Sequence, residues 1–132
     1  MAIRLSRLAA LFAASLGCTG PALAEFRLRI LHTNDIHSRL EPINRQDSTC
    51  GAKDEAAGAC FGGTARLATA IGRERLPASL LLDAGDQFQG SLFYTHYQGQ
   101  EVAELMGRLG YDAMAIGNHE FDNGVPVLQR FA

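Results

Sequence analysis

Three short apolar segments, each followed at once by polar residues, constrain the fold of this chain more than any other feature. They lie at residues 26–31, 79–83 and 113–116. The second, Ser-Leu-Leu-Leu-Asp, is apolar almost throughout, which is typical of a strand buried on both faces of a parallel sheet. The first alternates large apolar residues with arginine, which also favours a strand. The sequence therefore predicts three strands.

Segments with apolar residues at helical spacing follow each of these strands. They predict helices at residues 63–75, 100–109 and 125–131. Residues 38–62 are rich in glycine, alanine and charge, and predict a long loop. Alternating strands and helices imply right-handed crossovers and a parallel sheet covered by helices. The expected fold class is α/β, with a ligand crevice at the carboxyl ends of the strands.

Each predicted strand is followed by a polar cluster that has two interpretations. Asp-Ile-His at residues 35–37 offers a carboxylate and an imidazole, which suit zinc, manganese or iron, but such pairs are common in loops. Gly-Asp-Gln-Phe-Gln-Gly at 85–90 brings a carboxylate close to a ligand or forms a plain turn. Gly-Asn-His-Glu-Phe-Asp at 117–122 supplies a dense set of metal ligands or a solvated helix cap.

Taken together, the three clusters are far more specific than any one of them. Asp-x-His, Gly-Asp-x-x-x-Gly and Gly-Asn-His-Glu, in this order, resemble the N-terminal motifs of the calcineurin-like metallophosphoesterases. Longer stretches resemble one branch, the secreted bacterial 5′-nucleotidases: ILHTNDIHS at 30–38, DAGDQFQGS at 83–91 and AIGNHEFD at 115–122. The resemblance implies the N-terminal half of a four-layered α/β/β/α sandwich with a mostly parallel sheet.

The resemblance also implies a site for two divalent metal ions. Asp35 and His37 match the ligands of the first ion, Asp86 matches the carboxylate shared by both, and Asn118 matches a ligand of the second. A shared carboxylate offsets part of the repulsion between two cations that lie about 3.5–4 Å apart. Carboxylate, amide and imidazole ligands tolerate zinc, manganese, cobalt or iron, so the sequence does not identify the metal.

The same resemblance assigns catalytic roles to residues that follow the third strand. His119 matches the histidine that stabilises the transition state or protonates the leaving oxygen, and Asp122 matches the carboxylate that orients it. Asn118 and His119 are also the expected contacts to the substrate phosphate. Glu120, and Asp83 at the end of the second strand, are expected to support the loops, whereas His32 and His96 are expected to be structural.

The function implied is hydrolysis of nucleoside 5′-monophosphates to nucleoside and phosphate, with a nucleotide as the small-molecule partner. Relatives that keep the metal site but act on 2′,3′-cyclic nucleotides or UDP-sugars give one alternative. A non-catalytic periplasmic binding segment gives another. The family places further ligands, mostly histidines, and a nucleotide-binding C-terminal domain beyond the motifs present at residues 25–132. This region is therefore expected to be the N-terminal part of the metallophosphoesterase domain, with little turnover of its own and one sheet face uncovered.

The first 24 residues have the three features of a signal peptide, in order. Arg4 and Arg7 precede an apolar run at 8–16, and Ala-Leu-Ala at 22–24 offers a cleavage site. The apolar run is shorter than the ~20 residues that a membrane span requires. We therefore expect a periplasmic or secreted protein, with a buried N-terminal helix, or lipid attachment at Cys18, as the alternatives.

Cys50 and Cys60 are the cysteines that would remain after cleavage. In an oxidising compartment such a pair predicts a disulfide, whereas half of a thiolate metal site would normally show a closer spacing. The 12 basic and 14 acidic residues give a net charge of −2, which argues against binding of a nucleic-acid polymer.

Overall fold

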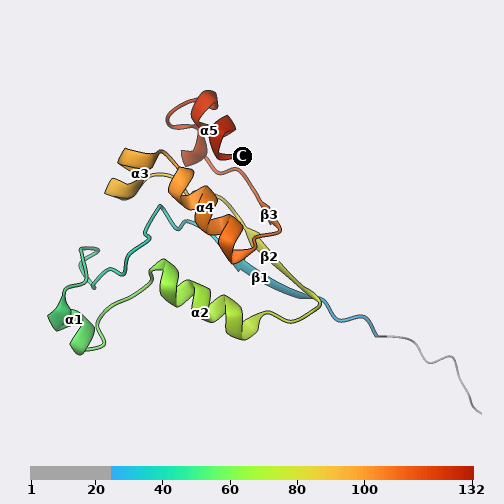
Figure 1. The fold of residues 1–132 in the computed structure, drawn as a ribbon, viewed down its shortest axis with the longest axis horizontal. Coiled ribbons are helices and arrows are strands. Elements are labelled where there is room, and N and C mark those ends of the chain that lie inside the picture. Colours follow the sequence, from blue (N-terminus) through green and yellow to red (C-terminus); the bar gives the residue numbers. More distant parts are fainter. Residues whose placement is uncertain (1–24) are drawn as a thin grey trace, which may run out of the picture.

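The computed structural model describes residues 25–132, so the predicted signal peptide at 1–24 and Cys18 lie outside it. The elements follow the expected alternation (Figure 1): β1 (Arg29–Thr33), α1 (Ala52–Ala56), α2 (Thr64–Glu74), β2 (Ser79–Asp83), α3 (Leu92–Tyr97), α4 (Gln100–Leu109), β3 (Ala113–Met114), the 3-10 helix η1 (His119–Phe121) and α5 (Val125–Phe131). None of the helices at residues 25–132 is long and apolar enough to cross a membrane.

The strands form one parallel sheet in the order β1-β2-β3. Arg29 pairs with Ser79 and Thr33 with Asp83, so β1 and β2 end side by side. Parallel neighbours of this kind need long connections, and helices supply them here (Figure 1). The predicted α/β class and parallel sheet are confirmed.

Two strands differ from their predicted bounds because pairing, rather than composition, sets the ends. β1 runs from Arg29 to Thr33 instead of residues 26–31, since it pairs with β2 from Ser79 to Asp83. β3 stops at Met114 instead of residue 116. The amide of Ala115 still donates to the Asp83 carbonyl at 2.8 Å, but β2 ends there and offers no further partner.

The helices were predicted well except where tertiary packing decides. α4 and α5 have the predicted bounds, and α2 is one residue shorter at each end. α3 was not predicted, and His96 lies in it. Its aromatic residues are poor helix formers, but Tyr94 packs on Phe88 with ring centroids 4.9 Å apart. The short α1 lies inside the predicted long loop.

The two faces of the sheet differ in burial. Leu81 is 1% exposed, but its neighbour Leu80, on the opposite face, is 36% exposed. Ile30, the register partner of Leu80, is 55% exposed. β2 is therefore buried on one face only, whereas its composition predicted burial on both faces. We call Ile30, the exposed His32 and Leu80 the open face.

A small aromatic core lies beyond the carboxyl end of β2. Phe88, Tyr94 and Val127 are buried, and Phe131 packs edge-on against Phe88 with ring centroids 5.0 Å apart. Phe88 is two residues after Asp86, so this core anchors the loop that carries the predicted bridging carboxylate.

The predicted disulfide between Cys50 and Cys60 is present, with the two Cα atoms 5.7 Å apart. It closes the loop that contains α1. The side chain of Glu55 lies close enough to both sulfur atoms to form a metal-like cluster, but thiols joined in a disulfide do not supply thiolate ligands.

Candidate metal centre

The loops that follow β1 and β2 stay paired after the strands end. The Asp35 amide donates to the Gly85 carbonyl at 3.0 Å, and the His37 amide donates to the Asp86 carbonyl at 3.1 Å. These bonds extend the parallel register into the polar clusters. They bring the first two predicted clusters together at one edge of the sheet.

Two glycines allow the third cluster, at residues 117–122, to lie in contact with the second cluster, at residues 85–90. A Cβ atom on Gly85, whose φ is +102°, would lie 2.6 Å from the Gly117 nitrogen. A Cβ atom on Gly117 would overlap the Asp86 carboxylate. No side chain fits at either position without moving the backbone. The glycines therefore let the loops at 85–90 and 117–122 touch.

Glu120 ties these two loops together. It is fully buried, and its carboxylate accepts four backbone N–H groups. Oε1 accepts from Gln87 at 2.7 Å and from Phe88 at 3.2 Å, while Oε2 accepts from Asp86 at 3.0 Å and from Gly117 at 2.6 Å. A buried carboxylate needs such donors. Glu120 thus has the supporting position that the sequence predicted.

Asp83 supports the same loop from the end of β2. It is 4% exposed, and it accepts hydrogen bonds from the Gly85 amide at 2.9 Å and from the Gln87 side chain at 2.7 Å. The Thr33 hydroxyl donates to it as well. These bonds use the carboxylate within the loop, in agreement with the supporting position expected from the sequence.

Three predicted residues form a compact cluster at this edge. His37, Asp86 and His119 each place one potential ligand atom within 4.8 Å of the other two. The His37 Nδ1 atom lies 2.9 Å from the Phe88 carbonyl, which can only accept, so Nδ1 carries the proton. The lone pair of His37 is therefore on Nε2, the usual arrangement for a metal-ligating histidine.

Asp35 and Asn118 flank the cluster. An Asp35 carboxylate oxygen lies 3.8 Å from the His37 Nε2 atom. The Asn118 side-chain amide can be placed in either of two orientations, which exchange its oxygen and nitrogen. With nitrogen toward Asp86 it donates to Oδ2 at 3.3 Å, and its oxygen accepts from the His119 amide at 3.3 Å. With oxygen toward Asp86, two acceptors face each other, an arrangement that a cation between them stabilises.

His119 and Asp122 form a hydrogen-bonded pair beside the cluster. The His119 Nδ1 atom lies 2.7 Å from Asp122 Oδ2. This hydrogen bond, with the negative charge behind it, raises the pKa of His119 above its usual value. The same hydrogen bond lowers the pKa of Asp122. The pair therefore favours an imidazolium beside a carboxylate, with Nε2 left free to act.

Backbone strain concentrates in the same loops. Seven non-glycine residues in the described range have positive φ, and five of them are in the loops after β1 and β2: Asp35, His37, Ser38, Asp86 and Gln89. Such conformations cost about 1–3 kcal/mol each and persist only where the surroundings enforce them. Residues in such conformations are often found at active sites and ligand-binding sites.

The residues at this edge fit divalent metal ions. Two imidazoles, carboxylates and an amide oxygen are the ligand types of zinc, manganese and iron sites. The lone pair of His37 is on Nε2, the ring nitrogen that makes no hydrogen bond to Phe88. The Asn118 oxygen can face the Asp86 carboxylate.

Residues 28–132 match the family model described as calcineurin-like phosphoesterase. The chain belongs to the calcineurin-like phosphoesterase family. Its relatives in this family include 5′-nucleotidase from Bos taurus, 56% identical over 82% of this chain and 18% of the relative. A snake venom 5′-nucleotidase from Gloydius brevicauda is 50% identical over 81% of this chain and 18% of the relative. The chain thus spans about a fifth of the length of these calcineurin-like relatives.

Solved structures show the same family fold. A 5′-nucleotidase precursor from Thermus thermophilus superposes with a TM-score of 0.66 and 41% identity, over 80% of this chain and 20% of that one. The NAD nucleotidase of Haemophilus influenzae superposes with a TM-score of 0.63 and 28% identity, over 79% and 18%. These neighbours confirm the expected metallophosphoesterase fold, of which this chain matches the N-terminal half. The mammalian and snake relatives do not single out the bacterial secreted branch, so that finer assignment stays a prediction.

The structure also places in this calcineurin-like site two residues that the sequence did not reveal. Ser38 is fully buried directly after His37, and Glu101, on α4, lies 3.2 Å from its hydroxyl group. In the sequence, Ser38 resembles an ordinary loop residue, and Glu101 resembles an ordinary acidic residue in the first turn of a helix. Their contact spans 63 positions, so no local spacing could have predicted it.

Proposed function

We propose that this chain carries metal-binding and catalytic residues of a 5′-nucleotidase, which converts a nucleoside 5′-monophosphate and water to a nucleoside and phosphate. The observation that carries the proposal is the cluster of His37, Asp86 and His119, with Asp122 behind His119. Relatives named 5′-nucleotidase support the substrate class. Because the chain spans about a fifth of their length, the activity is proposed for the full-length gene product.

Two divalent ions are proposed to bind at the strand edge. Asp35 and His37 would hold the first, Asp86 would hold both, and Asn118 would hold the second. The free Nε2 of His37 and the contact between Asn118 and the Asp86 carboxylate support this assignment. When bound, such ions act as Lewis acids on phosphoryl oxygens and lower the pKa of coordinated water. Zinc, manganese, cobalt and iron all suit these ligands.

His119 is proposed to act as the general acid. Its Nδ1 atom is held by Asp122, and its raised pKa favours the imidazolium, which leaves a proton on Nε2. As the bond between phosphorus and the nucleoside oxygen breaks, Nε2 gives that proton to the leaving oxygen, and water supplies the new oxygen on phosphorus. Asn118 and His119 would also contact the substrate phosphate. A ligand role for His119 is the alternative, because it lies within the cluster.

Export is part of the proposal. Residues 1–24 have the order of a signal peptide, and the disulfide between Cys50 and Cys60 suits an oxidising compartment. The proposed location is therefore periplasmic or extracellular.

The decisive experiment measures phosphate released from AMP by the full-length gene product, after chelation and after addition of Mn²⁺ or Zn²⁺. Asp86→Ala and His119→Ala are compared with Glu104→Ala, a control at an exposed residue of α4 that pairs with Arg108. We expect metal-dependent release that both site variants lose and the control keeps. His119→Ala should still bind the wild-type number of ions, whereas loss of an ion would make His119 a ligand. Metal-independent release, or failure to bind any ion, would overturn the proposal.

A second substrate class should be tested in the same assay. The structural neighbour from Haemophilus influenzae is named an NAD nucleotidase, and it shares the fold of this chain. NAD, a UDP-sugar and a 2′,3′-cyclic nucleotide should therefore be compared with AMP at equal concentration. Release from one of these, but not from AMP, would retain the metal site and replace the substrate. Binding of two ions without hydrolysis of any ester would favour a non-catalytic binding protein.

A further inference from the structure

Ser38 occupies a strained and fully buried position next to a proposed metal ligand. Its φ is +49°, and that of His37 is +52°. Ser38 is 0% exposed. Two successive left-handed residues that are not glycine cost about 1–3 kcal/mol each. Contacts from elsewhere must therefore hold this stretch of backbone in place.

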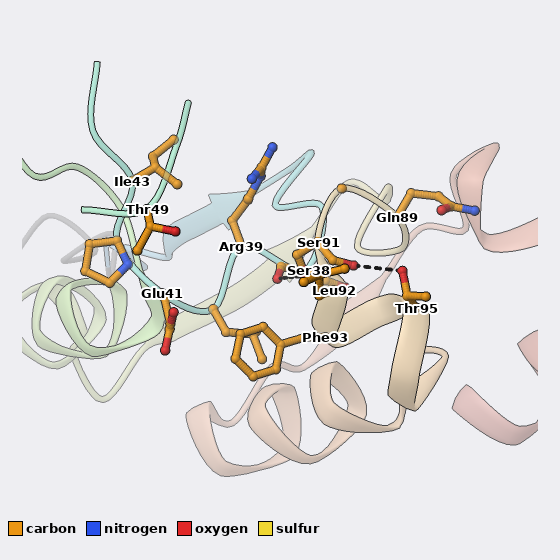
Figure 2. Close-up of a pocket in the computed structure, with 13 residues that line it drawn as sticks. Ser38, Arg39, Glu41, Ile43, Thr49, Gln89, Ser91, Leu92, Phe93 and Thr95 are labelled. Atoms are coloured by element: carbon orange, nitrogen blue, oxygen red, sulfur yellow. Dashed lines mark hydrogen bonds between the residues drawn. The ribbon is translucent and has the colours of Figure 1, made fainter. Parts of the chain in front are cut away.

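Part of that support comes from the segment after β2. The Ser38 amide donates to the Gln87 carbonyl at 2.8 Å. The Ser91 hydroxyl donates to the Ser38 carbonyl at 2.7 Å. Figure 2 shows Ser38 and Ser91 close together among the residues that line a pocket. The pocket has a volume of about 530 Å³. The backbone of Ser38 is thus fastened at both ends to the loop that carries Asp86.

Glu101 supplies support of a different kind. It reaches Ser38 from the first turn of α4, with its Oε1 atom 3.2 Å from the Ser38 hydroxyl, which also lies 3.0 Å from the Gln87 carbonyl. The other oxygen, Oε2, is buried and has no hydrogen-bond partner among residues 25–132. A buried carboxylate oxygen without a donor is costly. Among residues 25–132, Glu101 is the only charged residue whose side chain lies within hydrogen-bonding distance of Ser38.

The orientation of the His37 ring depends on this backbone. The His37 amide donates to the Asp86 carbonyl, and the ring Nδ1 donates to the Phe88 carbonyl at 2.9 Å. Both bonds require residues 37 and 38 to keep their place against residues 86–88. A shift of Ser38 would break the Nδ1 bond and turn Nε2 away from Asp86. Residues behind a ligand often change metal affinity by 10–100-fold when they are removed.

We infer that Glu101 is a positioning residue for the metal site: through Ser38, it fixes the backbone that aims the His37 ring at the cluster. The inference rests on the proposed function only in taking His37 as a metal ligand. Glu101 is not among the proposed metal ligands or phosphate contacts, so its effect is inferred to pass through Ser38.

The experiment is a metal-affinity measurement on the full-length gene product, by Zn²⁺ titration against a competing chelator. Glu101→Ala, Ser38→Ala and the double variant are compared with Glu104→Ala on the same helix. Thermal unfolding in EDTA is recorded for each, so that a loss of stability is separated from a loss of affinity. We expect Glu101→Ala to weaken the tighter site by about tenfold or more. Ser38→Ala should do the same, and the double variant should lose little beyond either one, because the two residues act in series.

Two results would overturn the inference. One is a Zn²⁺ affinity of Glu101→Ala equal to that of Glu104→Ala, and the other is fully additive losses in the double variant. If Glu101→Ala does not fold, Glu101→Asp withdraws the carboxylate from Ser38 by one methylene, keeps the charge, and carries the same expectation. Phosphate release from AMP is scored separately. Weakened Zn²⁺ binding without AMP hydrolysis in the wild type would leave this inference intact and reject the nucleotidase.

Discussion

The edge of the sheet at the carboxyl ends of its strands buries polar groups, whereas the open face of the same sheet exposes apolar ones. At the edge, polar groups are buried, paired and held in strained conformations, as Glu120 and Ser38 show. On the open face, apolar side chains such as Ile30 and Leu80 stay exposed. Burial of apolar groups is favourable and burial of polar groups is costly. Both regions therefore carry an energetic cost, and at the edge this cost is associated with the proposed metal site.

The largest expected effect is at the edge. Asp86→Ala removes the carboxylate proposed to hold both ions, and we expect phosphate release from AMP to fall by about a thousandfold, because metal ions contribute several kcal/mol to transition-state stabilisation. Its unfolding midpoint in EDTA should stay close to that of the wild type. Steady-state kinetics with saturating Mn²⁺ and thermal unfolding of the same samples test this. A large loss of stability with activity retained would mean that Asp86 is structural.

Glu120→Ala should have the next largest effect, this time on stability. It leaves four backbone N–H groups without their acceptor, and each buried unpaired donor costs about 1–3 kcal/mol. We expect a loss of at least about 3 kcal/mol in the free energy of unfolding, measured by urea denaturation. Glu104→Ala is the matched control and should change it by less than about 0.5 kcal/mol. A loss as small as that of the control would show that water replaces the carboxylate.

The two faces of β2 can be compared with adjacent leucines. Leu81→Ala should cost about 2–4 kcal/mol, because Leu81 is 1% exposed. Leu80→Ala should cost less than about 1 kcal/mol, because Leu80 is 36% exposed. Urea denaturation of both variants measures the difference. Equal losses would mean that another copy or another part of the gene product covers the open face in solution.

The remaining prediction concerns the disulfide, which lies outside both regions. Cys50→Ser with Cys60→Ser removes a disulfide that closes a short loop, and we expect a loss of about 2–3 kcal/mol by the chain-entropy model. Activity with AMP should be retained, because none of the proposed ligands lies in that loop. Wild-type protein in reducing agent should behave like the double variant. A fall in metal affinity would instead connect the loop to the site.

The sequence predicted the elements that depend on local pattern. β2, α4 and α5 have their predicted bounds because apolar spacing and glycine turns set them. The ends of β1 and β3 depend on which residues find a pairing partner, which the pattern does not contain. α3 depends on the packing of Tyr94 against Phe88, a tertiary contact that overrides weak helix propensity.

The residues of the candidate site also fall into two groups, those predicted from local motifs and those that depend on tertiary contacts. Asp35, His37, Asp86, Asn118 and His119 stand in motifs at strand ends, and the parallel register brings them to one edge. The extent of Glu120's hydrogen bonding, and the contact of Glu101 with Ser38, follow from how loops far apart in sequence meet. A serine and a first-turn glutamate have many ordinary roles, so their residue types carried no signal.

The hydrogen bonds of Glu120 also affect the order of events during folding. Three of its four partners are amides 32 to 34 positions earlier in the chain, so they form only after that long segment has closed on itself. The loop around Asp86 cannot take its final shape before then. In a refolding experiment, the ability to bind an ion should emerge with the last kinetic phase, after most helical signal has returned. Metal uptake would then report on completed folding.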